Sequence, residues 1–154
     1  SLAEVKTSVA AMSIEERLDV TAFIAHLNRA EDPEYRAELD RRMADMDSGR
    51  KTTAGELERL HEDLSRKGDD PGHKFVVNDP VLEFFSGRSR REREELLRIW
   101  RGLAAAPYQK GEWLQKTASG RELQVKRFGR WLVRYWLDDP VREVRIVDVE
   151  KVVP

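Results

Sequence analysis

The spacing of the apolar residues changes along this chain, and the change limits the folds that the chain can adopt. Before residue 67 apolar side chains recur every three to four positions, as they do on one face of a helix. From Glu122 onward apolar and polar residues alternate, which is typical of strands with one buried face. Helices first and strands later predict an α+β fold.

The first part is expected to be helical throughout. Three helix starts carry N-capping signatures, at Ser13–Glu16, Asp32–Glu34 and Thr53–Glu56. Gly49 is well suited to end the middle helix. The apolar stripes of these helices are narrow, so we expect the helices to need a partner surface rather than to form a core of their own.

The segment Lys67–His73 separates the two patterns. It contains two glycines, one proline and two aspartates, a composition that neither continues a helix nor packs as a strand. We therefore expect a helical segment over residues 1–67, a linker over 68–73 and a second domain over 74–154.

The second domain is predicted to contain a strand, two helices and a three-stranded antiparallel meander, with the helices on one face of the sheet. The first strand is Lys74–Val77, and the helices begin at Asp79 and Ser89. The meander is expected from Glu122 to Ile146, with a turn at Asp138–Pro140.

The two parts carry opposite charge. Residues 1–73 contain 11 Lys and Arg against 17 Asp and Glu, a net charge of −6, and residues 74–154 contain 17 against 12, a net charge of +5. An acidic segment followed by a basic one suggests two partners that bind each other, or a basic surface covered by an acidic strap.

Composition argues against several classes of site. The chain has no cysteine, so it has no disulfide, zinc-thiolate site or thiol nucleophile, which fits a reducing cytoplasm. No apolar run reaches the roughly 18–20 residues of a membrane span. The three histidines lie in separate elements: His26, His61 and His73. We therefore expect a cytoplasmic protein with no metal, no cofactor and no membrane contact.

The order of elements in residues 74–152 and the run Gly120–Leu137 resemble the toxins of RelE/ParE-type toxin–antitoxin systems. The helix lengths are closer to the RelE-like branch. Residues 1–67 resemble the helical antitoxins encoded beside such toxins, through the segments Met12–Arg17, Asp32–Glu34, Arg41–Asp45 and Ser48–Gly49. The resemblance implies a RelE-like toxin fold with a helical antitoxin segment wrapped on it.

The resemblance also implies an activity, that of a ribosome-dependent mRNA endonuclease neutralised by the acidic segment. Such chemistry needs cations to stabilise a phosphorane. One strand lysine of the family corresponds to Lys126. Other basic positions of the family fall on residues that cannot serve, namely Gln124, Leu132 and Val152, so most of the expected catalytic residues are absent.

Arginines of the second domain are candidates to replace the missing residues. Alternation along the second meander strand would place Arg130 and Arg134 on one face, away from the helices, and we expect both to act with Lys126 in catalysis. Arg121, Arg127 and Arg145 are expected to bind RNA. The alternative is that these arginines pair with Asp148, Glu143 and the acidic half. In the antitoxin-like segment the residues expected to contact the toxin are Leu57, Leu60 and Leu64.

Two further functions stay open at this stage. The scarcity of nuclease residues favours a ParE-like toxin that binds DNA gyrase without catalysis, and a third alternative is an inert interaction module. The expected partners are the antitoxin segment, within one chain or between chains, and then mRNA on the ribosome or DNA gyrase. A homodimer is also open.

Overall fold

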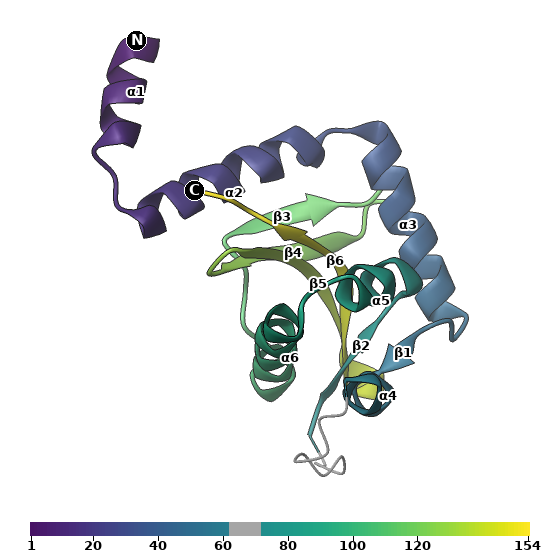
Figure 1. The fold of residues 1–154 in the computed structure, drawn as a ribbon. Coiled ribbons are helices and arrows are strands. Elements are labelled where there is room, and N and C mark those ends of the chain that lie inside the picture. The colour runs from purple at the N-terminus through teal and green to yellow at the C-terminus, as the bar shows by residue number, and fades with distance from the viewer. Residues whose placement is uncertain (62–71) are drawn as a thin grey trace.

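The structure is a computed structural model of the chain and describes residues 1–61 and 72–154 (Figure 1). The first part consists of helices α1 (Leu2–Ala10), α2 (Ile14–Ala30) and α3 (Pro33–Asp47), strand β1 (Thr52–Thr53) and helix α4 (Ala54–Leu60). The second part consists of β2 (Lys74–Val77), α5 (Asp79–Ser86), α6 (Arg90–Ala105), β3 (Trp113–Lys116), β4 (Glu122–Phe128), β5 (Trp131–Asp138), the 3₁₀ turn η1 (Asp139–Val141) and β6 (Glu143–Lys151). The predicted α+β class is confirmed.

All strands belong to one six-stranded sheet, in the order β1-β2-β6-β5-β4-β3. β2 runs parallel to β6, and the other neighbouring pairs are antiparallel. The sheet contains two strands that the sequence did not predict. β3 adds a fourth antiparallel strand beside β4, and β1 pairs with β2 at the opposite edge, so that the acidic part contributes a strand to the sheet.

The predicted helix boundaries follow from local hydrogen bonds. Ser13 and Glu16 form both bonds of a capping box at the start of α2. The Asp32 carboxylate accepts from the backbone N–H of Glu34 at the start of α3. Gly49 follows α3 with a φ of 93°, a conformation that glycine adopts without strain. None of the helices in the described part of the chain is long and apolar enough to cross a membrane.

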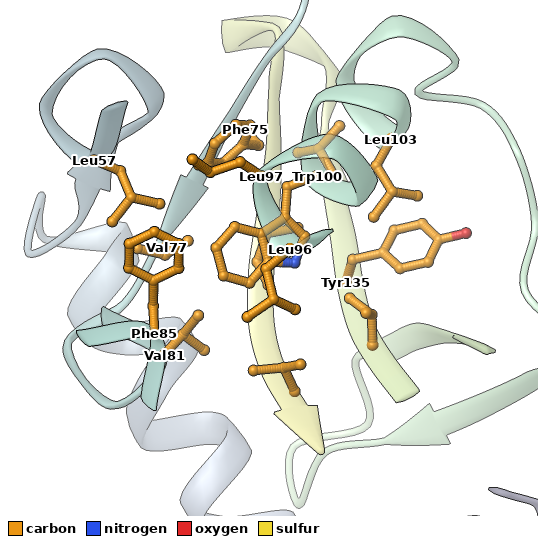
Figure 2. Packing of buried hydrophobic residues seen from close by; sticks show 14 of the residues in the cluster. Leu57, Phe75, Val77, Val81, Phe85, Leu96, Leu97, Trp100, Leu103 and Tyr135 are labelled. Carbon is orange, nitrogen blue, oxygen red and sulfur yellow. The ribbon is translucent and has the colours of Figure 1, made fainter. Parts of the chain in front are cut away.

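Helices cover both faces of the sheet. α5 and α6 lie on one face, where a large cluster of buried side chains fills the space between helices and strands (Figure 2). Its bulkiest members are Phe75, Phe85, Trp100, Trp131 and Tyr135. On the other face, α2 runs across the sheet and α3 runs along one side of it (Figure 1). Each of these helices packs on a smaller buried cluster.

Each buried cluster combines residues from both parts of the chain. Leu57 of α4 belongs to the large cluster. Leu18 of α2 packs in a cluster with residues of β4 and β5, and Leu39 of α3 packs in another with residues of β4 and β6. Within the described residues, the first part forms no cluster of its own. It lies across the basic part, as its narrow apolar stripes indicated. α1 stands apart from this body and has no buried residue (Figure 1).

A β-bulge in β6 determines which of its side chains face α2 and α3. Arg134 pairs with Asp148, but the next residue, Tyr135, pairs with Ile146, so Val147 is the extra residue. Ile146 packs with the α5 and α6 cluster, whereas Val147 packs with Leu39 and other residues of α3. The bulge therefore turns Val147 and Asp148 to the same side and brings Asp148 beside Arg134.

We predict that Leu39→Ala destabilises the whole protein by about 2–5 kcal/mol, because it leaves a cavity between α3 and the sheet at a fully buried position. The matched control is Leu60→Ala, at a leucine that is 67% exposed, which should change stability by less than about 0.5 kcal/mol. Urea unfolding followed by far-UV circular dichroism measures both. Equal midpoints for the two variants would contradict the packing of α3 described above.

Candidate nucleic-acid interface

We call the side of the sheet that contacts α2 and α3 the covered face. The strand pairing places side chains of three strands on this side, because residues directly opposite each other on neighbouring strands share a face. They are Leu123, Val125 and Arg127 on β4, Leu132, Arg134 and Trp136 on β5, and Arg145, Val147, Asp148 and Glu150 on β6. The face is thus a mixture of apolar side chains and arginines.

Arg134 is fully buried on the covered face. Its Nη1 lies 2.9 Å from Oε1 of Glu150 and 3.4 Å from Oδ2 of Asp148. Its guanidinium carbon lies 5.2 Å from the centroid of the Tyr35 ring on α3. Its Nε and Nη2 have no hydrogen-bond acceptor among the described residues. A buried cation needs such partners because its desolvation is costly, and here the acidic part of the chain closes over it.

Asp148 connects the sheet to α3. Its carboxylate accepts hydrogen bonds from the Tyr35 hydroxyl and from Nη1 of Arg42, the latter at 3.0 Å. Burial, and then the charge of Asp148, raise the pKa of Tyr35 well above its usual value. The phenol therefore keeps its proton and remains a donor at neutral pH. A carboxylate of β6 is in this way held by two side chains of α3.

Arg127 lies at the end of β4 and binds α2. Its Nε is 2.8 Å from Oδ1 of Asp19, and its Nη2 is 3.1 Å from Oε2 of Glu15. Its side chain is only 13% exposed, although both carboxylates are largely exposed. Two acidic residues on successive turns of α2 therefore neutralise this arginine.

Arg121 and Arg145 share a carboxylate of α3. Oδ1 of Asp47 accepts from Nη1 of Arg145 at 2.6 Å, and Oδ2 accepts from Nη2 of Arg121 at 3.0 Å. Both guanidinium carbons lie 5.2 Å from the centroid of the Trp136 ring. Burial would raise the pKa of Asp47, but the hydrogen bonds from the two arginines outweigh it and lower the pKa.

The three arginines expected to bind RNA thus all form ion pairs with carboxylates of α2 or α3. Arg121 and Arg145 bind Asp47, and Arg127 binds Glu15 and Asp19. This is the pairing with the acidic half that was the alternative interpretation of the sequence. That interpretation also named Asp148 and Glu143 as acceptors: Asp148 pairs with Arg134, whereas Glu143 binds Lys51 instead. The acidic helices therefore place carboxylates along a row of cations.

The three residues expected to act in catalysis are not brought together, and the expectation that Arg130 and Arg134 share a face of the strand is wrong. Lys126 pairs across the sheet with Val133 and lies on the α6 side, where its Nζ donates to Gln109 at 2.9 Å. Arg134 lies on the opposite, covered face. Arg130 is in the turn before β5, where strand alternation does not apply, and it binds Glu95 of α6 at 2.9 Å.

The leucines expected to contact the toxin-like part have different surroundings. Leu57 is fully buried in the large cluster, whereas Leu60 is 67% exposed. Leu64 lies outside the described residues. α4 also carries Glu58, which the sequence did not single out, and its Oε1 lies 2.9 Å from Nε of Arg101 on α6.

Sequence reasoning also missed Asp47 and Trp136. Asp47 is the last residue of α3, a helix with no basic residue in its last turn. A negative charge at that end is disfavoured by the helix dipole, so an acidic helix C-terminus was a signal that a cation compensates it. Trp136 gave no comparable signal, because an aromatic residue in a strand usually packs in a core.

We predict that the docking of α3 weakens in acid. The pKa values of Asp47 and Asp40 are lowered in the folded state because, despite some burial, they accept hydrogen bonds, Asp40 from Ser119. Lowered pKa values contribute stability that is present above the unfolded-state pKa of about 4 and is lost as the pH falls through the folded-state pKa. Thermal unfolding from pH 6 to pH 2.5 should therefore show a smaller acid-induced drop for Asp40→Asn/Asp47→Asn than for the wild type. Parallel curves would contradict this.

Comparison with known proteins found no matching family model, no similar curated protein and no similar solved structure.

Proposed function

We propose that residues 72–154 act as a RelE/ParE-like toxin that inhibits translation by binding mRNA, and that residues 1–61 act as its inhibitor. The observation that carries the proposal is the pairing of the predicted RNA-binding arginines with the acidic helices. Arg121, Arg127 and Arg145 are each held by a carboxylate of α2 or α3. An RNA strand would have to replace these carboxylates to reach the same cations.

Electrostatics support an inhibitory role for the acidic part. A basic surface attracts polyanions over a distance of about one Debye length, near 8–10 Å at physiological salt. The carboxylates of Glu15, Asp19 and Asp47 form ion pairs with the arginines, so they neutralise the positive charge that would attract a polyanion. The opposite net charges of the two parts also favour binding of the acidic part to the basic part.

Apolar packing supports tight inhibition. Leu18 and Ala22 of α2 and Leu39 and Met43 of α3 are buried against the covered face. A fully buried leucine or methionine side chain contributes roughly 1.5–3 kcal/mol relative to an exposed one. A competing ligand would therefore have to overcome hydrophobic burial as well as ion pairs, which favours a cover that stays closed until the acidic part is removed.

A second candidate function is a toxin that binds a protein target such as DNA gyrase. The observation that favours it is the separation of Lys126 and Arg134 onto opposite faces of the sheet. A catalytic site that needs both cations at one phosphate is not assembled by this arrangement. The apolar residues and arginines of the covered face would equally suit a protein partner, because arginine is enriched at protein interfaces.

The test is to express the two parts from separate promoters in a bacterial host. We predict that inducing residues 72–154 alone stops growth and lowers the incorporation of labelled methionine, and that adding residues 1–61 restores both. Plasmid supercoiling, measured in the same cells, separates the two candidates, because only gyrase inhibition changes it before protein synthesis falls. Normal growth with a soluble, folded 72–154 fragment would refute both.

A charge-reversed inhibitor tests the role of the ion pairs. Residues 1–61 carrying Glu15→Lys and Asp19→Lys should rescue growth less well than the wild-type segment, because these residues hold Arg127. The control matched in charge is Glu4→Lys/Glu31→Lys, at two exposed carboxylates that form no ion pair with the basic part among the described residues. Equal rescue by the two segments would mean that apolar packing alone provides the inhibition.

A further inference from the structure

Arg121, Arg127, Arg134 and Arg145 form a row of arginines on the covered face. Helices α2 and α3 leave the end of this row at Arg121 partly open to solvent. At the C-terminal end of α3 the side chain of Asp47 is 42% exposed and that of Arg121 is 37% exposed. Arg134, near the middle of the covered face, is fully buried. A ligand could therefore reach the group formed by Arg121, Arg145 and Trp136 in the intact chain if the Asp47 carboxylate did not occupy it.

This group is preorganised to bind an anion. The Trp136 ring lies 5.2 Å from the guanidinium carbons of both arginines, a distance at which cation–π attraction holds a guanidinium in place. Nη2 of Arg145 is also fixed by Asp138 at 3.1 Å. The Arg145 side chain is only 5% exposed, so the surrounding protein atoms restrict its movement. The two guanidinium groups thus converge on one anion, which is the carboxylate of Asp47.

Asp47 and Asp138 leave two buried N–H donors of these arginines without an acceptor among the described residues. Both Asp47 oxygens are in use, one on each arginine. Nε of Arg145 and Nη1 of Arg121 are buried and have no acceptor in the described part of the chain. An arginine has five N–H donors, and unpaired buried donors are costly. A phosphate group carries more acceptor oxygens than a carboxylate, and its additional oxygen could accept from Nη1 of Arg121, which shares the outer edge of the guanidinium with the Nη2 that binds Asp47.

We propose that Asp47 occupies a phosphate-binding site formed by Arg121, Arg145 and Trp136, and that the ligand of this site is a backbone phosphate of a single RNA strand. The choice of RNA rests on the proposed function, whereas the choice of phosphate follows from the donors. Arg121 precedes β4 and Arg127 lies near its other end, roughly 20 Å away at about 3.4 Å per residue. Cations spread over such a distance fit a polymer of phosphates better than a single ion.

The experiment uses the full chain with Asp47→Asn, which keeps the shape of the side chain and removes its charge. The probe is a 5′-fluorescein-labelled 12-nucleotide polyuridine, and the readout is fluorescence anisotropy. We expect Asp47→Asn to bind this RNA about tenfold or more tightly than the wild type, as for charge-assisted hydrogen bonds gained by a phosphate. Adding Arg145→Gln to the variant should remove the gain.

A matched control separates the site from net charge. Asp45→Asn makes the same charge change in the same helix, and the Asp45 carboxylate has no ion pair in the described residues. It should bind RNA like the wild type. Equal binding by the Asp45 and Asp47 variants, or a gain that survives Arg145→Gln, would overturn the proposal. Circular dichroism establishes that each variant is folded, and Asp47→Ala repeats the test with a different side chain.

Two further probes identify the ligand chemistry. A peptide nucleic acid of the same base sequence has no phosphate and should not bind the Asp47→Asn variant. Inorganic phosphate should compete only at concentrations far above those of the RNA. Binding of the peptide nucleic acid would overturn the phosphate assignment, and competition by inorganic phosphate at equal concentration would overturn the assignment to a strand.

Failure of this inference can be told apart from failure of the proposed function. If residues 72–154 are harmless in cells but Asp47→Asn gains RNA binding through Arg145, the phosphate site stands and the toxin function fails. If residues 72–154 inhibit translation but Asp47→Asn gains nothing, the toxin function stands and the phosphate site fails.

Discussion

The ion pairs of Arg134 with Asp148 and Glu150 organise the interface between the two parts of this protein. A charge without access to solvent costs several kcal/mol unless partners compensate it, and breaking such a pair from one side typically costs about 3–5 kcal/mol. Asp148 is in turn held by Tyr35 and Arg42 of α3. The acidic helices are therefore part of the environment that makes a buried arginine tolerable, and their removal would return that arginine to solvent.

Apolar and charged contacts have different consequences at this interface. Side chains such as Leu39 and Leu57 supply most of the free energy that holds the first part on the sheet, because hydrophobic burial scales with the area removed from water. Ion pairs with a largely exposed carboxylate, such as Asp19–Arg127, contribute less stability each, but they help to determine which surface is covered. The same contacts that complete the fold thus bury the arginines, and they would couple stability to the proposed inhibition.

Local sequence signals were enough to predict much of the fold. The helix starting at Ser13, the helix starting at Asp32 and the order of elements after Lys74 all follow from capping chemistry and periodicity, which depend on near neighbours in the chain. The two-residue strand β1 and the four-residue strand β3 were missed. β1 is too short for a period to be visible, and β3 lacks the β-branched residues that mark the equally short β2. Both segments become strands because β2 and β4 offer an edge to pair with.

The arginines, the acidic residues and the opposite charges of the two parts are evident from the sequence alone. Which of these residues meet depends on the tertiary fold. Strand register placed Lys126 opposite Val133 on the α6 side, away from Arg134. Side chains of directly opposite residues on neighbouring strands point to the same face, and the next residue along each strand points to the other face. The bulge at Val147 and the end of α3 at Asp47 then selected the partners of the buried arginines. Asp47 and Arg145 are 98 positions apart in the chain, and local periodicity contains no information about such a pairing.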